Sequence, residues 1–283
     1  MHTPPDNAIG ADPKSPASWD HSNREEFVRY YAESSLSAAT LTRFRTIRDR
    51  ILVVRRLVNA DGVCEVVDIG CGPGASSLIW TERGHRVTGI DVSAAFVDLA
   101  RQRAAKAGFS ARFETASATD LPLSDASVDV CVMLELLEHV RDWKSCIDEC
   151  TRVLRPGGAL YLSTTNRLCP KQQEYNLPLY SWYPAVLKRR YETLAVTTRP
   201  QIANFATYPA VHWFSFYSLK AALQQRGFVG FYDRFDLISL EDRGVLLNAL
   251  ITAIQKCTPL RFLGHVMTPS TSILAIKACQ RPS

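Results

Sequence analysis

The sequence predicts an α/β fold built around a doubly wound parallel sheet. A β-branched run at 64–69 leads into a turn with three glycines, and a helix-compatible segment at 75–83 follows. From there to residue 164, apolar runs that suit strands alternate with helical patterns. Strands interleaved with helices are typical of a parallel sheet whose two faces are both covered by helices.

Each element of this sheet has a local signal. Strands are expected at 64–69, 85–90, 111–115, 128–134 and 159–164, and helices at 94–107 and 143–154. Gly108 closes the first of these helices, and Pro156-Gly157-Gly158 stops the second. The apolar run at 128–134 is what a strand buried on both faces needs. A helix at 218–225 and strands at 228–237 and 272–278 complete the core.

The chain divides into this core and several additions. The tail at 1–22 is rich in Pro, Asp and Ser and is predicted to be flexible. In the next segment, 23–60, apolar residues spaced by three and four predict a helical region at 25–58. The core occupies 61–164 and 215–283, with a cap insertion at 165–214 and an apolar helical insertion at about 241–267. The cap insertion is too long for a connecting loop and is expected to cover the site.

Composition narrows the possible functions. The 283 residues are 46% hydrophobic and 22% charged, and the net charge of +5 is spread along the chain. This distribution favours a solvated basic surface over nucleic-acid binding. The eight cysteines lack the paired spacing of zinc sites, and the first residues do not resemble a signal sequence. We therefore expect a cytoplasmic protein without a membrane span, because no apolar stretch reaches about 18 residues.

The segment at 245–254 is apolar almost all round, with only a narrow polar stripe. This pattern favours a helix buried in the core, and it also fits an interfacial helix that contacts lipid. The second interpretation would make the protein membrane-peripheral, or give it contact with a lipid-like substrate.

The glycine turn is the strongest functional signal in the chain. Its three glycines stand where the backbone must turn sharply and let a ligand approach, and N–H groups at the start of the next helix can bind an anion. Residues 70–75 also satisfy the dinucleotide pattern G-x-G-x-x-G/A, so the turn alone selects no cofactor. Ligands of such sheets bind at the carboxyl ends of the strands, so four strand ends are expected to converge: Gly70, Asp91, Ser117 and Leu134.

Six short motifs follow one another over about 64–164. They are Val67-Asp68-Ile69-Gly70-Cys71-Gly72-Pro73-Gly74, Gly89-Ile90-Asp91-Val92-Ser93, Asp120-Leu121-Pro122-Leu123, Val128-Asp129-Val130, Glu135-Leu136-Leu137-Glu138-His139-Val140 and Leu154-Arg155-Pro156-Gly157-Gly158. In order and spacing they resemble the class I S-adenosylmethionine-dependent methyltransferases. The resemblance implies a Rossmann-like, doubly wound, seven-stranded methyltransferase sheet with a cap insertion. It also implies S-adenosylmethionine as the cofactor.

The same resemblance implies which residues hold that cofactor. Asp91 would accept hydrogen bonds from both ribose hydroxyls, and the glycine turn would pass against the methionine part. Asp68 would organise the turn or bind the methionine ammonium through water. Ser117 stands where the family usually has an acid for the adenine amino group, so this contact is expected to be weaker or to move to a backbone carbonyl. The implied set is Asp68, Gly70, Cys71, Gly72, Gly74, Asp91, Val92, Ser117, Ala118 and Leu134.

Two carboxylates and two histidines are the candidate catalytic residues. Glu135, Glu138 and His139 are spaced i, i+3 and i+4, so on a helical turn they share one face and can bind a divalent metal or supply a base. The segment resembles ubiquinone-pathway O-methyltransferases most closely, and also small-RNA 2′-O-methyltransferases. Both use a Glu-x-x-Glu-His metal site, to which the RNA enzymes add a later histidine, here His212. The resemblance thus implies Mg²⁺ on these four residues, although metal-free methyltransferases also carry such a segment.

The leading prediction is methylation of a small-molecule acceptor at a hydroxyl. Six aromatic residues of the cap insertion favour a bulky apolar or aromatic acceptor: Tyr175, Tyr180, Trp182, Tyr183, Tyr191 and Tyr208. The alternatives are an N- or C-methyltransferase of secondary metabolism, and a non-catalytic protein that binds S-adenosylmethionine. Methylation of nucleic acid and NAD-dependent oxidoreduction fit the sequence less well. The oligomeric state is not predicted.

Overall fold

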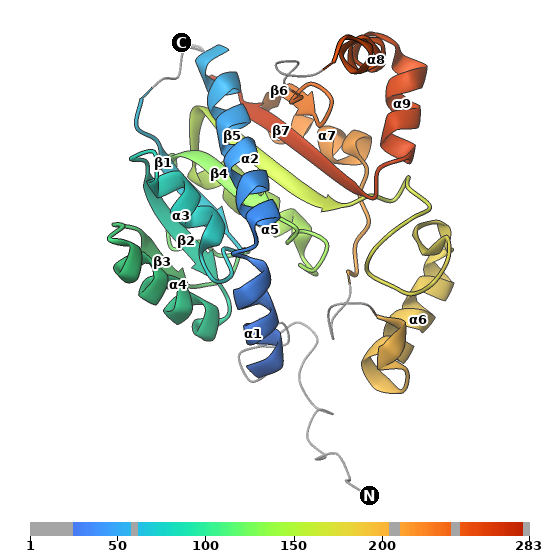
Figure 1. Ribbon diagram of the computed structural model, residues 1–283, viewed down its shortest axis with the longest axis horizontal. Helices are drawn as coiled ribbons and strands as arrows, with labels where there is room; N and C mark the ends of the chain where they lie inside the picture. The colour runs from blue at the N-terminus through green and yellow to red at the C-terminus, as the bar shows by residue number, and fades with distance from the viewer. Residues whose placement is uncertain (1–24, 58–61, 204–209, 239–243, 280–283) are drawn as a thin grey trace, which may run out of the picture.

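A seven-stranded sheet forms the centre of the protein, which is represented by a computed structural model (Figure 1). The structure describes residues 25–57, 62–203, 210–238 and 244–279. The strand order is β3-β2-β1-β4-β5-β7-β6. The strands are β1 (Glu65–Ile69), β2 (Arg86–Asp91), β3 (Arg112–Thr115), β4 (Val128–Leu134), β5 (Leu154–Thr165), β6 (Phe228–Asp233) and β7 (Ser270–Lys277).

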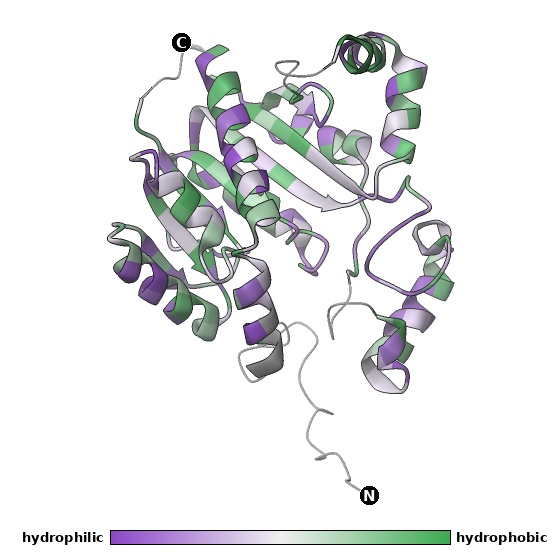
Figure 2. Cartoon of the chain, in the orientation of Figure 1, coloured by the Kyte–Doolittle hydropathy of each residue, from purple (hydrophilic) through white to green (hydrophobic). Residues whose placement is uncertain are grey.

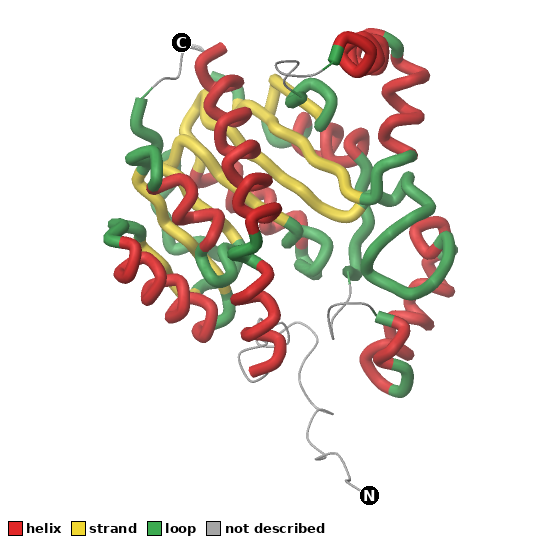
Figure 3. The backbone as a smooth tube through the Cα atoms, viewed as in Figure 1, coloured by secondary structure: helices red, strands yellow, loops and turns green. Residues whose placement is uncertain are grey.

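Helices cover both faces of this sheet (Figure 3). They are α1 (Glu25–Ser34), α2 (Ala38–Leu57), α3 (Ala75–Thr81), α4 (Ala94–Ala107), α5 (Trp143–Val153), α6 (Ala185–Thr197), α7 (Phe216–Gln224), α8 (Val245–Lys256) and α9 (Thr258–Val266), with short 3₁₀ turns η2 (Tyr180–Trp182) and η3 (Pro200–Ile202). Apolar side chains of α2 and α3 pack on one face, and those of α5 and α7 pack on the other. The predicted α/β architecture is therefore confirmed.

The chain reverses its direction of travel across the sheet at β1. This strand pairs in parallel with β2 on one side and with β4 on the other, whereas β7 runs antiparallel to both β5 and β6. A crevice at the carboxyl ends of the strands is expected at such a switch point, because the connections on its two sides lead to opposite faces. The glycine turn follows β1 directly and so lies at this point.

Three elements differ from the prediction by more than a small shift of their ends. The helical region expected at 25–58 is two helices, because Ser37 starts a new one by accepting the Thr40 N–H at 3.2 Å. Pro156-Gly157-Gly158 lies inside β5 instead of before it: the pairing with β4 shifts register between Val128 and Val130, and Gly157 has φ +76°. The strand expected at 228–237 ends at Asp233, whose carboxylate accepts the N–H of Phe235 at 2.7 Å and so forms a turn.

The cap insertion has a small core of its own. Tyr175 and Tyr180 are fully buried, with ring centroids 4.1 Å apart, and they pack with Ala195 of α6. In Figure 1, α6 lies at the right-hand edge, away from the sheet. The predicted flexible tail at 1–22 and Tyr208 lie outside the described residues.

The helix predicted at 245–254 exists as α8, but the expectation that it is buried is wrong. Ile251 is its one buried residue, whereas Val245 and Leu246 are 84% and 88% exposed. Figure 2 shows α8 as a largely apolar helix at the periphery of the molecule. In the part of the chain that the structure describes, no helix combines the length and apolar character needed to cross a membrane.

Candidate active site

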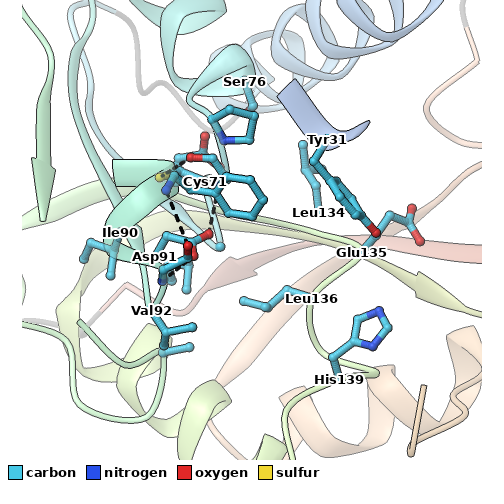
Figure 4. Close-up of a pocket in the computed structure, with 18 of the residues that line it drawn as sticks. Tyr31, Cys71, Ser76, Ile90, Asp91, Val92, Leu134, Glu135, Leu136 and His139 are labelled. Atoms are coloured by element: carbon cyan, nitrogen blue, oxygen red, sulfur yellow. Dashed lines mark hydrogen bonds between the residues drawn. The ribbon is translucent and has the colours of Figure 1, made fainter. Parts of the chain in front are cut away.

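A cavity of about 860 Å³ opens at the carboxyl ends of β1, β2 and β4. This volume is typical of small-molecule sites, which enclose about 300–1,000 Å³. All ten residues predicted to hold the cofactor lie in or beside the glycine turn and these strand ends, and all but Gly74 line the cavity itself. Figure 4 shows how several of the lining side chains lie, among them Cys71, Asp91, Leu134 and His139.

The glycine turn is shaped by its hydrogen bonds and by close packing. The N–H groups of Gly70 and Cys71 both donate to the Ile90 carbonyl, at 2.7 and 3.0 Å, which ties the turn to the end of β2. Gly72 has φ +51°, and a Cβ there would meet no atom within 4 Å, so the turn presents bare backbone to open space. Gly74 has φ +83°, and its Cβ would lie 2.7 Å from the Ala100 Cβ. Gly74 therefore lets the turn approach α4, while Gly72 leaves room for a ligand.

Asp91 is held rigidly at the end of β2. Its Oδ2 accepts the Gly72 N–H at 2.8 Å and its Oδ1 accepts the Ser93 N–H at 2.9 Å. Asp91 also lines the cavity, and an ionised carboxylate accepts hydrogen bonds of the kind a diol donates. The structure therefore fits the predicted contact with ribose hydroxyls.

Asp68 is buried beneath the glycine turn at the end of β1. Burial raises the pKa of its carboxyl to about 6, and hydrogen bonds from Ser77 and Ser76 offset only part of this effect. The Ser77 hydroxyl donates to Asp68 Oδ2 at 2.7 Å, which joins β1 to the first turn of α3. Asp68 is thus held from the helix that follows the glycine turn, and its two expected roles toward the turn and the methionine ammonium stay predictions.

The turn after β3 lines the part of the cavity that is predicted from the sequence to hold the adenine. The Ser117 hydroxyl lies 2.8 Å from that of Thr119 and also accepts the Thr119 N–H at 3.2 Å. The Ser117 side chain thus stabilises the turn itself, and its expected weaker contact with an adenine amino group stays a prediction. Ala118 presents a small side chain beside it.

Glu135 does not share a helical face with Glu138 and His139, so this part of the prediction is wrong. Glu135 has φ +50°, in the left-handed region, and the segment that follows it is a turn instead of a helix. Its Oε1 pairs with Arg43 Nη2 at 2.6 Å, and Arg43 lines the cavity from α2. The pair places one cation and one carboxylate next to the end of β4.

Glu138 points away from the cavity into the protein. It is 1% exposed, and its Oε2 accepts the Thr164 hydroxyl at 2.8 Å. Burial, with a smaller contribution from the charge of Glu135, raises the pKa of Glu138 well above its usual range. Its backbone carbonyl accepts the N–H groups of Val211 and His212 at 2.9 and 3.0 Å. Glu138 therefore connects the turn after β4 to residues 211–212 and to β5.

The two histidines lie in different environments. His139 lines the cavity (Figure 4), whereas His212 is absent from its lining and has its Nε2 2.9 Å from the Arg141 carbonyl oxygen. Within the described ranges, no group of three or more His, Cys, Asp or Glu side chains is arranged to hold a metal ion. The residues present therefore do not fit the predicted Mg²⁺ site, because Glu138 is turned inward and Glu135 is paired with Arg43.

The cavity is covered by α1 and α2 instead of by the cap insertion. None of the lining residues belongs to the described part of 165–214. Six of them come from α1, α2 and the turn between these helices: Tyr31, Ser34, Ser35, Thr40, Arg43 and Phe44. The sequence predicts a helical region here, but its pattern does not indicate that these helices lie over the site. Arg103 of α4 connects α1 to the glycine turn. Its guanidinium donates to the carbonyl oxygens of Ala32 and Pro73 at 2.7 and 2.9 Å.

The fold and this site define an α/β domain with a cavity at its switch point, where nucleotide-type cofactors bind in sheets of this kind. Comparison with known proteins identifies the class, because residues 67–162 match the methyltransferase domain family. This stretch of the chain is therefore similar to a methyltransferase domain.

Individual relatives agree with this assignment. The chain is 38% identical over 104 residues to a ubiquinone biosynthesis O-methyltransferase of Idiomarina loihiensis, a match that covers 36% of this chain and 43% of the relative. It is 35% identical over 142 residues to a probable S-adenosylmethionine-dependent methyltransferase of Mycolicibacterium smegmatis, covering 47% and 54%. The chain thus spans about half the length of these relatives. The fold is shared with a methyltransferase of Methanosarcina mazei, with a TM-score of 0.51 and 24% identity over 80% of this chain and 98% of that one.

Proposed function

We propose that this protein transfers the methyl group of S-adenosylmethionine to a hydroxyl of a small apolar or aromatic acceptor. The observation that carries the proposal is one continuous cavity, lined at one end by the glycine turn and Asp91 and at the other by His139. Donor and acceptor must lie side by side for a displacement at carbon, because the two reacting groups have to be aligned and water excluded.

The residues of the cavity fit the donor. Asp91 would hold the ribose, and the bare backbone at Gly72 would accommodate the methionine part. Arg43 lines the cavity and would bind the carboxylate of the donor once its ion pair with Glu135 opens. When bound, the sulfonium supplies an electrophilic methyl group, and the other requirements of the reaction fall to the protein.

His139 is the candidate general base. As the oxygen–methyl bond forms and the sulfur–methyl bond breaks, the hydroxyl proton of the acceptor would pass to the imidazole. Such proton transfer typically contributes about 10²–10⁴-fold to a rate. The apolar side chains around His139 include Leu134, Leu136 and Val140, which suit an apolar or aromatic acceptor better than a charged one.

The relatives that match residues of the core support a hydroxyl acceptor. Several of them are ubiquinone biosynthesis O-methyltransferases, although each match covers only about a third of this chain. N- or C-methylation remains the alternative, because the donor half of a methyltransferase does not determine the atom that is methylated.

Purified protein should be incubated with S-adenosylmethionine and three matched acceptors: an alkylated catechol, an alkylated amine and a β-dicarbonyl. We expect S-adenosylhomocysteine to accumulate with the catechol and a methyl ether to form. Turnover with only the amine would indicate N-methylation instead, and turnover with only the β-dicarbonyl would indicate C-methylation. A thermal-shift comparison with NAD⁺ completes the test, since stabilisation by NAD⁺ and not by S-adenosylmethionine would contradict a methyltransferase altogether.

A further inference from the structure

The pair of helices α8 and α9 carries the largest group of exposed apolar side chains in the described residues. The two helices are consecutive, joined at Cys257, and they lie at the edge of the molecule beyond β6 and β7 (Figures 1 and 2). Eight large apolar residues there are more than 40% exposed: Val245, Leu246, Leu247, Leu250, Leu260, Phe262, Leu263 and Met267. Many exposed apolar side chains on two consecutive helices favour a contact with a partner or a membrane, because single exposed apolar residues are common but groups of them are not.

The other side of α9 is fixed firmly to the core. Arg261 and His265 both contact the fully buried carboxylate of Asp233, at 2.7 and 2.8 Å. Gly264 lies so close to the Phe235 ring that an added Cβ would be 2.5 Å from it. Gln255 at the end of α8 donates to the Phe235 carbonyl at 2.8 Å. The polar anchors therefore face inward, and the apolar side chains are held outward by a folded scaffold.

The charge of this surface favours an anionic partner. Residues 244–267 contain no Asp or Glu, and Lys256 is exposed at the end of α8. A second element on the right-hand side of Figure 1, α6, follows η2 in the chain, and the two also carry exposed apolar and cationic residues. Trp182 and Val186 are 55% and 75% exposed, next to the exposed Arg189 and Arg190. Leucine, phenylalanine and tryptophan beside lysine and arginine are typical of helices that lie in a bilayer interface.

We propose that α8 and α9 bind the surface of an anionic lipid bilayer, with η2 and α6 as a second contact. The apolar side chains would enter the boundary between head groups and acyl chains, while Lys256 and Arg190 would meet anionic head groups. A second copy of this chain is a less suitable partner than an anionic bilayer, because the cationic surfaces of the two copies would repel each other. The proposal concerns binding alone and stands whether or not the protein methylates a hydroxyl.

Flotation of the full chain with vesicles tests this proposal. Vesicles of phosphatidylcholine with about 30% phosphatidylglycerol carry the negative surface that basic segments recognise. We expect at least about tenfold stronger partitioning into these than into pure phosphatidylcholine, and weaker binding at high salt because surface charges are then screened. The variant V245S/L246S/L250S should lose about tenfold or more of this partitioning, since each apolar side chain contributes through its burial in the lipid.

The controls separate lipid binding from damage to the fold. The replaced residues are exposed, so the unfolding midpoint of V245S/L246S/L250S should stay near that of the wild type. V53S/L57S removes two exposed apolar residues from α2, outside the proposed surface, and should bind vesicles like the wild type. K256E/R190E should weaken binding to anionic vesicles only. The proposal is wrong if the wild type remains with the soluble fraction, if the triple variant floats equally well, or if light scattering shows a dimer that this triple variant disrupts.

Discussion

The Asp91 carboxylate accepts a hydrogen bond from the Gly72 N–H, with 2.8 Å between Oδ2 and N. This contact connects the end of β2 to the middle of the glycine turn after β1. The same side chain is the one expected to accept hydrogen bonds from a ribose. One carboxylate therefore both shapes the turn and lines the cavity, so the two functions can be removed together by one substitution.

Asp91→Ala should weaken binding of S-adenosylmethionine by more than about tenfold, which corresponds to about 1.4 kcal/mol. The reason is the loss of a charged acceptor for the ribose, combined with the loss of the support for Gly72. Isothermal titration calorimetry measures the change directly. Asp98→Ala is the matched control, because Asp98 is an exposed carboxylate on α4 that pairs with Arg101. Wild-type affinity in Asp91→Ala would contradict this account of the cavity.

His139→Ala should lower kcat by about 10²-fold while the Kd of S-adenosylmethionine stays within about threefold. The imidazole lines the cavity but is separate from the glycine turn, so its removal should affect proton transfer more than binding of the donor. Added imidazole should restore part of the rate to the variant, as expected when a missing base is replaced from solution. An unchanged kcat would exclude His139 from the reaction.

The order of the core elements could be predicted from the sequence because local signals agree there with burial. The apolar run Val128–Leu134 is β4 to the residue, and Gly108 closes α4 with φ +69°. Likewise, the convergence of Gly70, Asp91, Ser117 and Leu134 followed from the parallel topology alone, and all four line the cavity. In these cases the side-chain pattern and the chain direction determine the position of a residue without further contacts.

The orientation of individual side chains could not be predicted in the same way. The spacing of Glu135, Glu138 and His139 fits a helical face, but the left-handed backbone at Glu135 breaks that periodicity. Thr164, which binds Glu138, lies on β5, and Arg43, which binds Glu135, lies on α2. Such partners come from distant parts of the chain, so the spacing of neighbouring residues contains no information about them. The exposure of α8 was not predicted for a related reason. An apolar sequence pattern does not show whether other elements of the fold cover the helix.

Glu138→Gln should keep kcat/KM within about threefold of the wild type, and a chelator should leave the activity unchanged. Burial raises the pKa of Glu138 well above its usual range and so favours the neutral carboxyl, and a neutral amide oxygen can accept the Thr164 hydroxyl in the same way. A metal ligand would not tolerate this change, because it binds as the carboxylate. Glu138→Ala, by contrast, should destabilise the protein by about 1–3 kcal/mol by leaving a buried hydroxyl without its acceptor. Activity lost in chelator and restored by Mg²⁺ would overturn this prediction.

Asp68 should make the protein less stable as the pH rises from about 4 to 6. The pKa of Asp68 is raised from 3.8 to about 6 in the folded protein, so between these values the folded state binds a proton that the unfolded state has released. The stabilisation is complete below the unfolded pKa and is lost as the pH passes the folded pKa, a change of about 3 kcal/mol at about 1.4 kcal/mol per unit. Urea denaturation at several pH values measures it. Asp68→Asn should flatten this dependence, and an equal slope in both proteins would contradict the assignment.

Arg103 is expected to keep the N-terminal helices over the cavity. Its guanidinium joins α4 to the Ala32 carbonyl and the Ser35 hydroxyl at one end of the cover, and to the Pro73 carbonyl in the glycine turn. Arg103→Ala should therefore increase hydrogen exchange across 25–37 and raise the Kd of S-adenosylmethionine by about 3- to 10-fold, with a loss of about 1–2 kcal/mol in the free energy of unfolding.

Lys106→Ala gives the control for this substitution, because Lys106 is an exposed cation in the last turn of the same helix. Lys106→Ala changes the net charge by the same amount but leaves the contacts of α1 with α4 intact, so hydrogen exchange at 25–37 should match the wild type. If Arg103→Ala weakens binding of the donor without faster exchange at 25–37, the arginine acts through the glycine turn alone. Faster exchange with unchanged affinity would show instead that the donor is held without help from α1 and α2.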